Sequence, residues 1–281
     1  MYEWKYSNKG KAVYSEQDFD DLISKHTVSL SEQRNKILAL NSRLREDLRL
    51  PEEALKSLRE LKINEADFQQ NGRLYPTLVY LDNNPAIRVR RGVEMLDAAA
   101  QADGTKQCWL SSGFNSLEGF SNDHVIWQPK NPDSISSLIC TGWHVVTLNL
   151  IFGLRSNCGF GWLKKDMTEG DTLAGADVVL WALATMNDLP GLFDGLDELH
   201  CLGLYLAGTE YSHGMYNEGH CLHGDKMGHV DPNPHVIVMM WAEHIRKFLF
   251  EEIRRSSFYE GCSSDSMYSV PICKSITPLA F

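Results

Sequence analysis

Long apolar runs are missing from this sequence of 281 residues. The longest, at 145–154, is much shorter than the roughly 20 residues that a helix needs to cross a bilayer. Residues 1–11 mix aromatic and charged side chains where a secretory signal would be continuously apolar. We therefore expect a cytoplasmic protein with no membrane partner.

Paired cysteine motifs, internal repeats and known metal-binding signatures are also missing. The seven cysteines form no CxxC pairs, and their odd number leaves at least one thiol free. No repeat period appears, which excludes a solenoid, and there is no HExxH motif. These absences favour a single domain over residues 1–281 with reduced thiols.

Basic residues are scarce relative to acidic ones, since 27 Lys and Arg stand against 37 Asp and Glu. Between residues 150 and 235, twelve acids stand against four bases, an excess of eight negative charges. Such a field repels nucleic acid and attracts cations or a basic protein. The basic cluster at 86–91 is too small for a nucleic-acid footprint, so no nucleic-acid partner is expected.

The patterns that are present predict an α+β fold. Residues 1–75 are a predicted helical N-terminal region, in which Ser29 and Glu32 have the spacing of a capping box. Residues 76–281 are a predicted mixed α/β core that carries a histidine-rich loop at 213–235. Helices are expected over 15–25, 92–101 and 174–186, and two more from Ser29 and from Pro51 onwards. Strands are expected over 77–81, 125–128 and 143–152. The segment 196–206 is expected to be helical or mixed.

A long amphipathic helix is expected near the C-terminus. Asp231 and Asn233 are suitable N-cap residues, and apolar residues then recur at helical spacing. The expected buried face comprises Ile237, Met240, Trp241, Ile245, Phe248, Leu249 and Ile253.

Histidine is concentrated around the loop 213–235. Seven of the ten histidines lie between residues 200 and 244, where glycines interrupt any helical or strand periodicity. Imidazole and carboxylate groups are ligands that zinc and iron take in proteins. The candidate ligands are His213, His220, His223, Asp225 and His229.

These residues favour a metal-dependent enzyme, either a hydrolase or an oxidoreductase, that acts on a small molecule or a peptide. Three of the candidate ligands would hold zinc or iron and leave one position open for water, and Glu218 would be the base. The alternative is a solvated loop whose polar side chains stabilise turns.

A second candidate site begins at Cys108. Residues 108–120, CWLSSGFNSLEGF, resemble the nucleophile helix of papain-like cysteine peptidases, with its Cys-Trp, later Ser and Leu-Glu-Gly. The resemblance implies a helix that begins at Cys108 and activates its thiol, although Ala102 stands where the family has an oxyanion-hole glutamine. His144 is the expected base and Asn157 an orienting residue, which would make the protein a cysteine amidase or peptidase. A packed structural cysteine is the alternative.

A third hypothesis involves no catalysis. The acidic stretch 150–235 would then bind a basic protein, such as a toxin, and neutralise it by charge complementarity.

Overall fold

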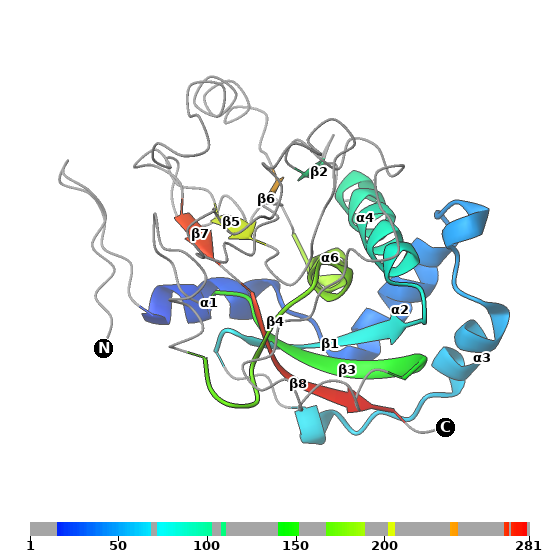
Figure 1. The fold of residues 1–281 in the computed structure, drawn as a ribbon, viewed down its shortest axis with the longest axis horizontal. Helices are drawn as coiled ribbons and strands as arrows, with labels where there is room; N and C mark the ends of the chain where they lie inside the picture. Colours follow the sequence, from blue (N-terminus) through cyan, green and yellow to red (C-terminus); the bar gives the residue numbers. More distant parts are fainter. Residues whose placement is uncertain are drawn as a thin grey trace, which may run out of the picture.

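The computed structural model describes residues 16–68, 72–102, 108–110, 140–151, 167–188, 202–205, 237–240, 267–269 and 271–279. These residues form helices and two four-stranded sheets, whose arrangement is shown in Figure 1. The predicted α+β class is therefore confirmed for this part of the chain.

Helices precede the first strand, as expected for the N-terminal region. The Ser29 hydroxyl accepts a hydrogen bond of 3.1 Å from the Glu32 amide, which confirms the predicted N-cap. Pro51 is itself the N-cap of the third helix. The bounds of these elements are α1 (Glu16–His26), α2 (Leu30–Asn41), the 3-10 helix η1 (Glu46–Leu48), α3 (Glu52–Glu60) and the 3-10 helix η2 (Glu65–Phe68).

The first sheet is antiparallel, with the strand order β1-β3-β8-β4. In its pairing of β3 with β1, His144 lies opposite Val79 and Gly142 lies opposite Leu81. The strands expected at 77–81 and from residue 143 are both confirmed. Their bounds are β1 (Leu74–Leu81), β3 (Gly142–Asn149), β4 (Thr172–Leu173) and β8 (Ile272–Pro278).

The outer edge of β1 is covered by a side chain of α2. The fully buried Gln33 donates from Nε2 to the Pro76 carbonyl at 2.8 Å, and its Oε1 accepts from the Leu78 amide at 2.8 Å. The side-chain amide of Gln33 thus makes the two hydrogen bonds that a neighbouring strand would make. Pro76 is tolerated in β1 because a proline without an N–H fits an edge strand.

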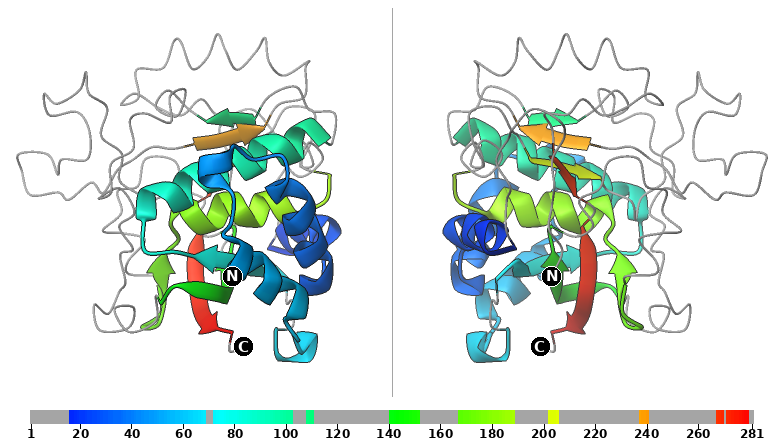
Figure 2. Two further views of the ribbon diagram at one scale, coloured as in Figure 1. Left: turned by 90° about the vertical axis from the view of Figure 1, so that its right-hand side faces the viewer. Right: turned by 90° about the vertical axis from the view of Figure 1, so that its left-hand side faces the viewer.

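Helices α4 (Pro85–Ala102) and α6 (Ala176–Thr185) confirm the two helices expected in the core. They pack against each other on one side of the first sheet, as Figure 2 shows. Gly92 permits this approach, because a Cβ atom there would lie 3.1 Å from the Leu180 Cβ. Every residue of α6 is buried, in keeping with its apolar sequence. Residues of α1, α2, α3, α4, α6, β1, β3 and β8 contribute to one hydrophobic cluster.

The second sheet overturns part of the predicted C-terminal helix. Residues 237–240 form strand β6, antiparallel to β2, so the helical prediction is wrong there. A short apolar run such as Ile-Val-Met-Met fits a buried strand as well as a helix, and pairing with β2 decides between them. The remainder of the predicted helix and the strand expected at 125–128 lie outside the described residues. The strand order is β2-β6-β5-β7, with bounds β2 (Cys108–Leu110), β5 (Leu202–Tyr205), β6 (Ile237–Met240) and β7 (Met267–Ser269).

The segment expected to be helical or mixed at 196–206 contributes β5, so its described part is a strand. None of the helices in the described ranges is long and apolar enough to cross a membrane.

Candidate functional site

The structure describes two of the predicted site residues. His144 is described completely, and Cys108 is described in its backbone. The other predicted residues lie outside the described ranges: Asn157, His213, Glu218, His220, His223, Asp225 and His229.

Cys108 begins strand β2, so the expectation of a helix that starts at this cysteine is wrong. It lies opposite Met240 in an antiparallel pair. The backbone amides of a strand pair with the neighbouring strand, whereas those of a helix N-terminus converge and stabilise a thiolate. Activation of Cys108 by a helix N-terminus is therefore excluded, while its pairing with His144 remains a prediction.

His144 is fully buried in β3, the strand between β1 and β8. Its Nδ1 lies 3.0 Å from the carbonyl oxygen of Gly142. A carbonyl oxygen can only accept a hydrogen bond, so Nδ1 carries the proton. In the neutral imidazole this leaves a lone pair on Nε2, the state that a general base requires.

Cys140 provides the partner that faces this lone pair. Its Sγ lies 3.6 Å from His144 Nε2, and the cysteine is exposed and has no disulfide. The geometry matches a thiol that donates to an imidazole, which is the arrangement of an activated cysteine nucleophile. The structure thus keeps His144 as a candidate base but places Cys140 beside it.

A bend in the chain makes this contact possible. Residues four apart in an extended strand would be separated by about 13 Å, too far for side chains to meet. The chain bends at Thr141, and Gly142 has a φ of +145°, so Cys140 turns back toward His144. The Thr141 hydroxyl donates to Asn83 Oδ1, which ties the bend to the loop after β1.

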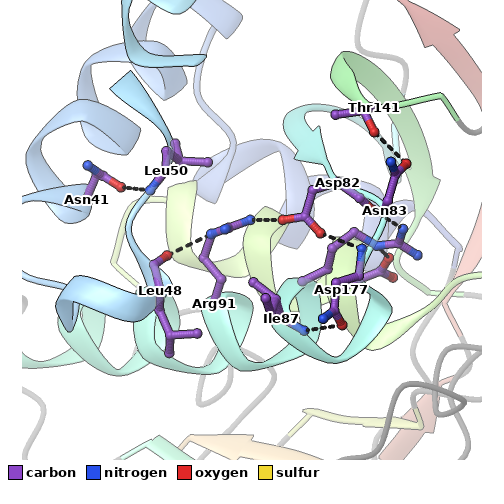
Figure 3. Close-up of polar contacts among 11 residues, drawn as sticks. Asn41, Leu48, Leu50, Asp82, Asn83, Ile87, Arg91, Thr141 and Asp177 are labelled. Carbon is purple, nitrogen blue, oxygen red and sulfur yellow. Dashed lines mark hydrogen bonds and ion pairs between the residues drawn. The ribbon is translucent and has the colours of Figure 1, made fainter. Parts of the chain in front are cut away.

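A partly buried charge network supports that loop, as Figure 3 shows. The Asp82 carboxylate accepts from Arg91 Nη1 at 2.8 Å, and the Asp82 carbonyl accepts from Arg88 Nη1 at 2.6 Å. Arg88 Nε also donates to Asp177 Oδ2 at 2.9 Å, which joins α4 to α6. Burial raises the pKa of Asp177, and the adjacent Arg88 guanidinium opposes that rise. Both arginines are engaged inside the protein, so the network holds the loop in place and offers no anion site.

The described part of the chain contains no candidate metal site. Within those ranges, no group of three or more His, Cys, Asp or Glu side chains is placed to hold a metal ion. Cys140 and His144 supply two donors, fewer than the three protein ligands of a catalytic zinc site. The predicted ligands of the loop 213–235 lie elsewhere, so the metal hypothesis stays a prediction.

Sequence reasoning missed Cys140, although a signal was present. The pair Thr141-Gly142 lies between Cys140 and His144, near the start of the predicted strand. Such a pair is typical of a turn, which can bring the two side chains together. Comparison with protein-family models, curated proteins and solved structures gave no match to this chain. The functional argument therefore depends on the geometry of the site.

Proposed function

We propose that this protein is a cysteine-dependent hydrolase of the amidase or peptidase class, with Cys140 as nucleophile and His144 as base. The supporting observation is the 3.6 Å separation between Cys140 Sγ and His144 Nε2, with Nδ1 of the same ring bonded to the Gly142 carbonyl. The exposed thiol is open to a substrate, while the buried imidazole is held in one orientation.

The reaction follows from these positions. His144 Nε2 takes the Cys140 proton, and the thiolate attacks the carbonyl carbon of an amide or ester. The bond to the leaving group breaks, and the leaving group receives the proton from the imidazolium. Water, deprotonated by His144, then cleaves the thioester, which returns the thiol and releases a carboxylic acid.

Iodoacetamide alkylation of the native protein, followed by peptide mass spectrometry, tests the pairing. Replacement His144→Gln should slow the alkylation of Cys140 at neutral pH by about tenfold or more, because the thiolate is the reactive form. Cys273 should remain unlabelled, since burial raises the pKa of its thiol to about 12.

The matched control is His26→Gln. His26 is also buried, but its Nδ1 lies 3.0 Å from the Asn187 carbonyl oxygen, and no thiol of the described residues bonds to its ring. Its replacement should leave the alkylation rate of Cys140 unchanged. Equal rates in the wild type and in His144→Gln, with both proteins folded by circular dichroism, would overturn the proposal.

A metal-dependent enzyme is a second candidate, favoured by the five histidines within residues 213–235. In this proposal His213, His220, His223, Asp225 and His229 provide the ligands for zinc or iron, with Glu218 as base. Protein purified without an affinity tag should contain near-stoichiometric metal by elemental analysis. The double replacement His220→Ala and His223→Ala should remove it, and a metal-free wild type that takes up none on titration would contradict this proposal.

A further inference from the structure

A pocket with a volume of about 300 Å³ opens where the turn between α1 and α2 meets η2 and strand β1. Its size lies at the lower end of the range for small-molecule sites in proteins. The pocket is remote from the Cys140–His144 pair. Pro76 in its wall and Leu81, which lies opposite Gly142, are about 16 Å apart along β1, because a strand rises about 3.3 Å per residue.

Hydrogen bonds hold the walls of this pocket in place. Gln33 Nε2 donates to the Val28 carbonyl at 3.3 Å and to the Pro76 carbonyl at 2.8 Å, which ties the turn to β1. Glu65 Oε1 accepts from the Ser31 amide at 3.0 Å and also from the Ser31 hydroxyl, which ties η2 to α2. The pocket is therefore formed before a ligand arrives, so little conformational entropy is lost on binding.

The polar groups of the pocket favour a positively charged ligand. Glu65 Oε1 is engaged by Ser31, but no hydrogen bond to Glu65 Oε2 occurs among the described contacts, so this oxygen can accept one from a ligand. The Thr27 hydroxyl donates to the Ser24 carbonyl at 3.0 Å, which leaves Thr27 as an acceptor. Among the described residues, no Lys, Arg or His side chain lines the pocket. An ammonium group, which has three donors and no acceptor, complements this lining.

The ends of two helices bear on the sign of the ligand. Thr27 and Val28 follow the C-terminus of α1, where the partial negative charge of a helix favours cations. The N-terminus of α2 would favour an anion, but the Ser31 amide is already bonded to Glu65 and the Glu32 amide to Ser29. The pocket is therefore better suited to a cation than to an anion.

Apolar side chains make up the rest of the lining, namely Val28, Leu30, Phe68 and Pro76. Such a surface suits the methylene groups of an alkyl chain, whereas a hard metal ion would require further oxygen ligands. Phe68 also adds an aromatic ring, and ammonium groups are attracted to such rings. The lining thus indicates a ligand with a charged head and an apolar stem.

We infer that this pocket binds a primary ammonium group carried on a short alkyl chain, as in a lysine side chain or a free alkylamine, with Glu65 as its counter-ion. The site lies outside the proposed hydrolase centre and does not depend on it.

The test titrates n-butylammonium and n-butanol into the wild type and follows the methyl resonances of Val28 and Leu30 by NMR. The two probes share an alkyl chain and differ in charge. Butylammonium should shift these resonances with an affinity in the millimolar range, since so small a probe makes few contacts. Butanol should bind at least about fivefold more weakly, because it cannot form the ion pair with Glu65.

The variant Glu65→Gln isolates the effect of the charge, because a glutamine Oε1 can still accept both hydrogen bonds from Ser31. It should weaken the binding of butylammonium by about fivefold. The control Asp67→Asn removes an exposed carboxylate from the same 3-10 helix, outside the pocket lining, and should leave the affinity unchanged.

A third probe, Nα-acetyl-lysine methylamide, identifies the source of the ammonium group. Tighter binding than that of butylammonium assigns the site to the lysine side chain of a protein, and equal or weaker binding assigns it to a free alkylamine. Both results support the ammonium site.

Three results would overturn the inference. They are equal shifts by butanol and butylammonium, equal weakening by Glu65→Gln and Asp67→Asn, and no shift by butylammonium at concentrations well above the millimolar range. If Glu65→Gln does not fold, the comparison of butylammonium with butanol on the wild type still decides.

Discussion

Gln33 illustrates how one buried side chain can replace a strand. Its amide bonds to the Pro76 carbonyl and the Leu78 amide, each at 2.8 Å, at the outer edge of β1. Removing it would leave two buried main-chain groups without partners, and each such group costs about 1–3 kcal/mol.

Replacement Gln33→Leu should therefore lower the free energy of unfolding by about 2–4 kcal/mol. The control is Gln17→Leu, because Gln17 is an exposed residue of α1 whose amide bonds only to Asp21 among the described contacts. Exposed substitutions change stability by about 0.5 kcal/mol. Urea denaturation measures the stability of both variants. Similar midpoints for the two would contradict the role of Gln33 at the strand edge.

At the same scale, sequence identified one member of the candidate site. His144 was expected at the head of a strand, and it is found there. Its thiol partner was not identified, because an i, i+4 contact at a strand end needs a bend, and the bend depends on the φ of Gly142 and on the distant Asn83. Such tertiary contacts are not encoded in local periodicity.

Among the elements, those with a strong local pattern were predictable. The strands β1 and β3 and the helices α4 and α6 form where β-branched runs and apolar helical segments indicate them. Strand β6 was predicted as helix because its four apolar residues suit both structures. Its pairing partners, β2 and β5, lie outside the local sequence, and β2 is more than a hundred residues away.

The end of α1 is fastened to the turn after α6 through His26. The His26 ring is buried, and its Nδ1 donates to the main-chain carbonyl of Asn187. In return, the main-chain amide of Asn187 donates to the His26 carbonyl at 2.9 Å. Burial lowers the pKa of His26, and the nearby Lys25 acts in the same direction. The Asn187 carbonyl and the Asp188 carboxylate oppose this change.

Stability should therefore depend on pH through this contact. The unfolded chain binds a proton to His26 at higher pH than the folded protein does, so stability is greatest above the ordinary pKa of 6.5. It should fall as the pH drops from 6.5 toward the lowered pKa of the folded state. Thermal or urea unfolding of the wild type and His26→Gln measures this pH dependence. An equal loss of stability in both proteins between pH 7 and 5 would contradict the role of His26.

Across the whole molecule, internal ion pairs reduce the acidic excess of residues 150–235. Asp171 is 2% exposed and bonds to Lys274 Nζ at 2.7 Å, and the fully buried Asp177 bonds to Arg88. Both bases lie outside that stretch. Among the described residues, two of the acids in this stretch are thus paired with bases from outside it.

The binding hypothesis predicts that the acidic charges of residues 150–235 steer a basic protein, such as a toxin, to the surface. Association should slow with added salt, since charges are screened within about 10 Å at 0.1 M. Replacement of Asp194, Asp197 and Glu198 by lysine should reduce capture without unfolding the protein. Pull-down from the source lysate at low and high salt measures this. Recovery of the same proteins by both variants at either salt would contradict the hypothesis.

The most direct measurement for the hydrolase proposal is the covalent intermediate on Cys140. With p-nitrophenyl acetate, the wild type should release nitrophenolate in a rapid first phase, and mass spectrometry after acid quenching should find the acetyl group on the peptide with Cys140. Cys140→Ala should abolish that phase, His144→Gln should slow it by about 100-fold, and Cys273→Ala should leave it intact. Acetyl groups found elsewhere, or a first phase that persists in Cys140→Ala, would show that Cys140 is not the nucleophile.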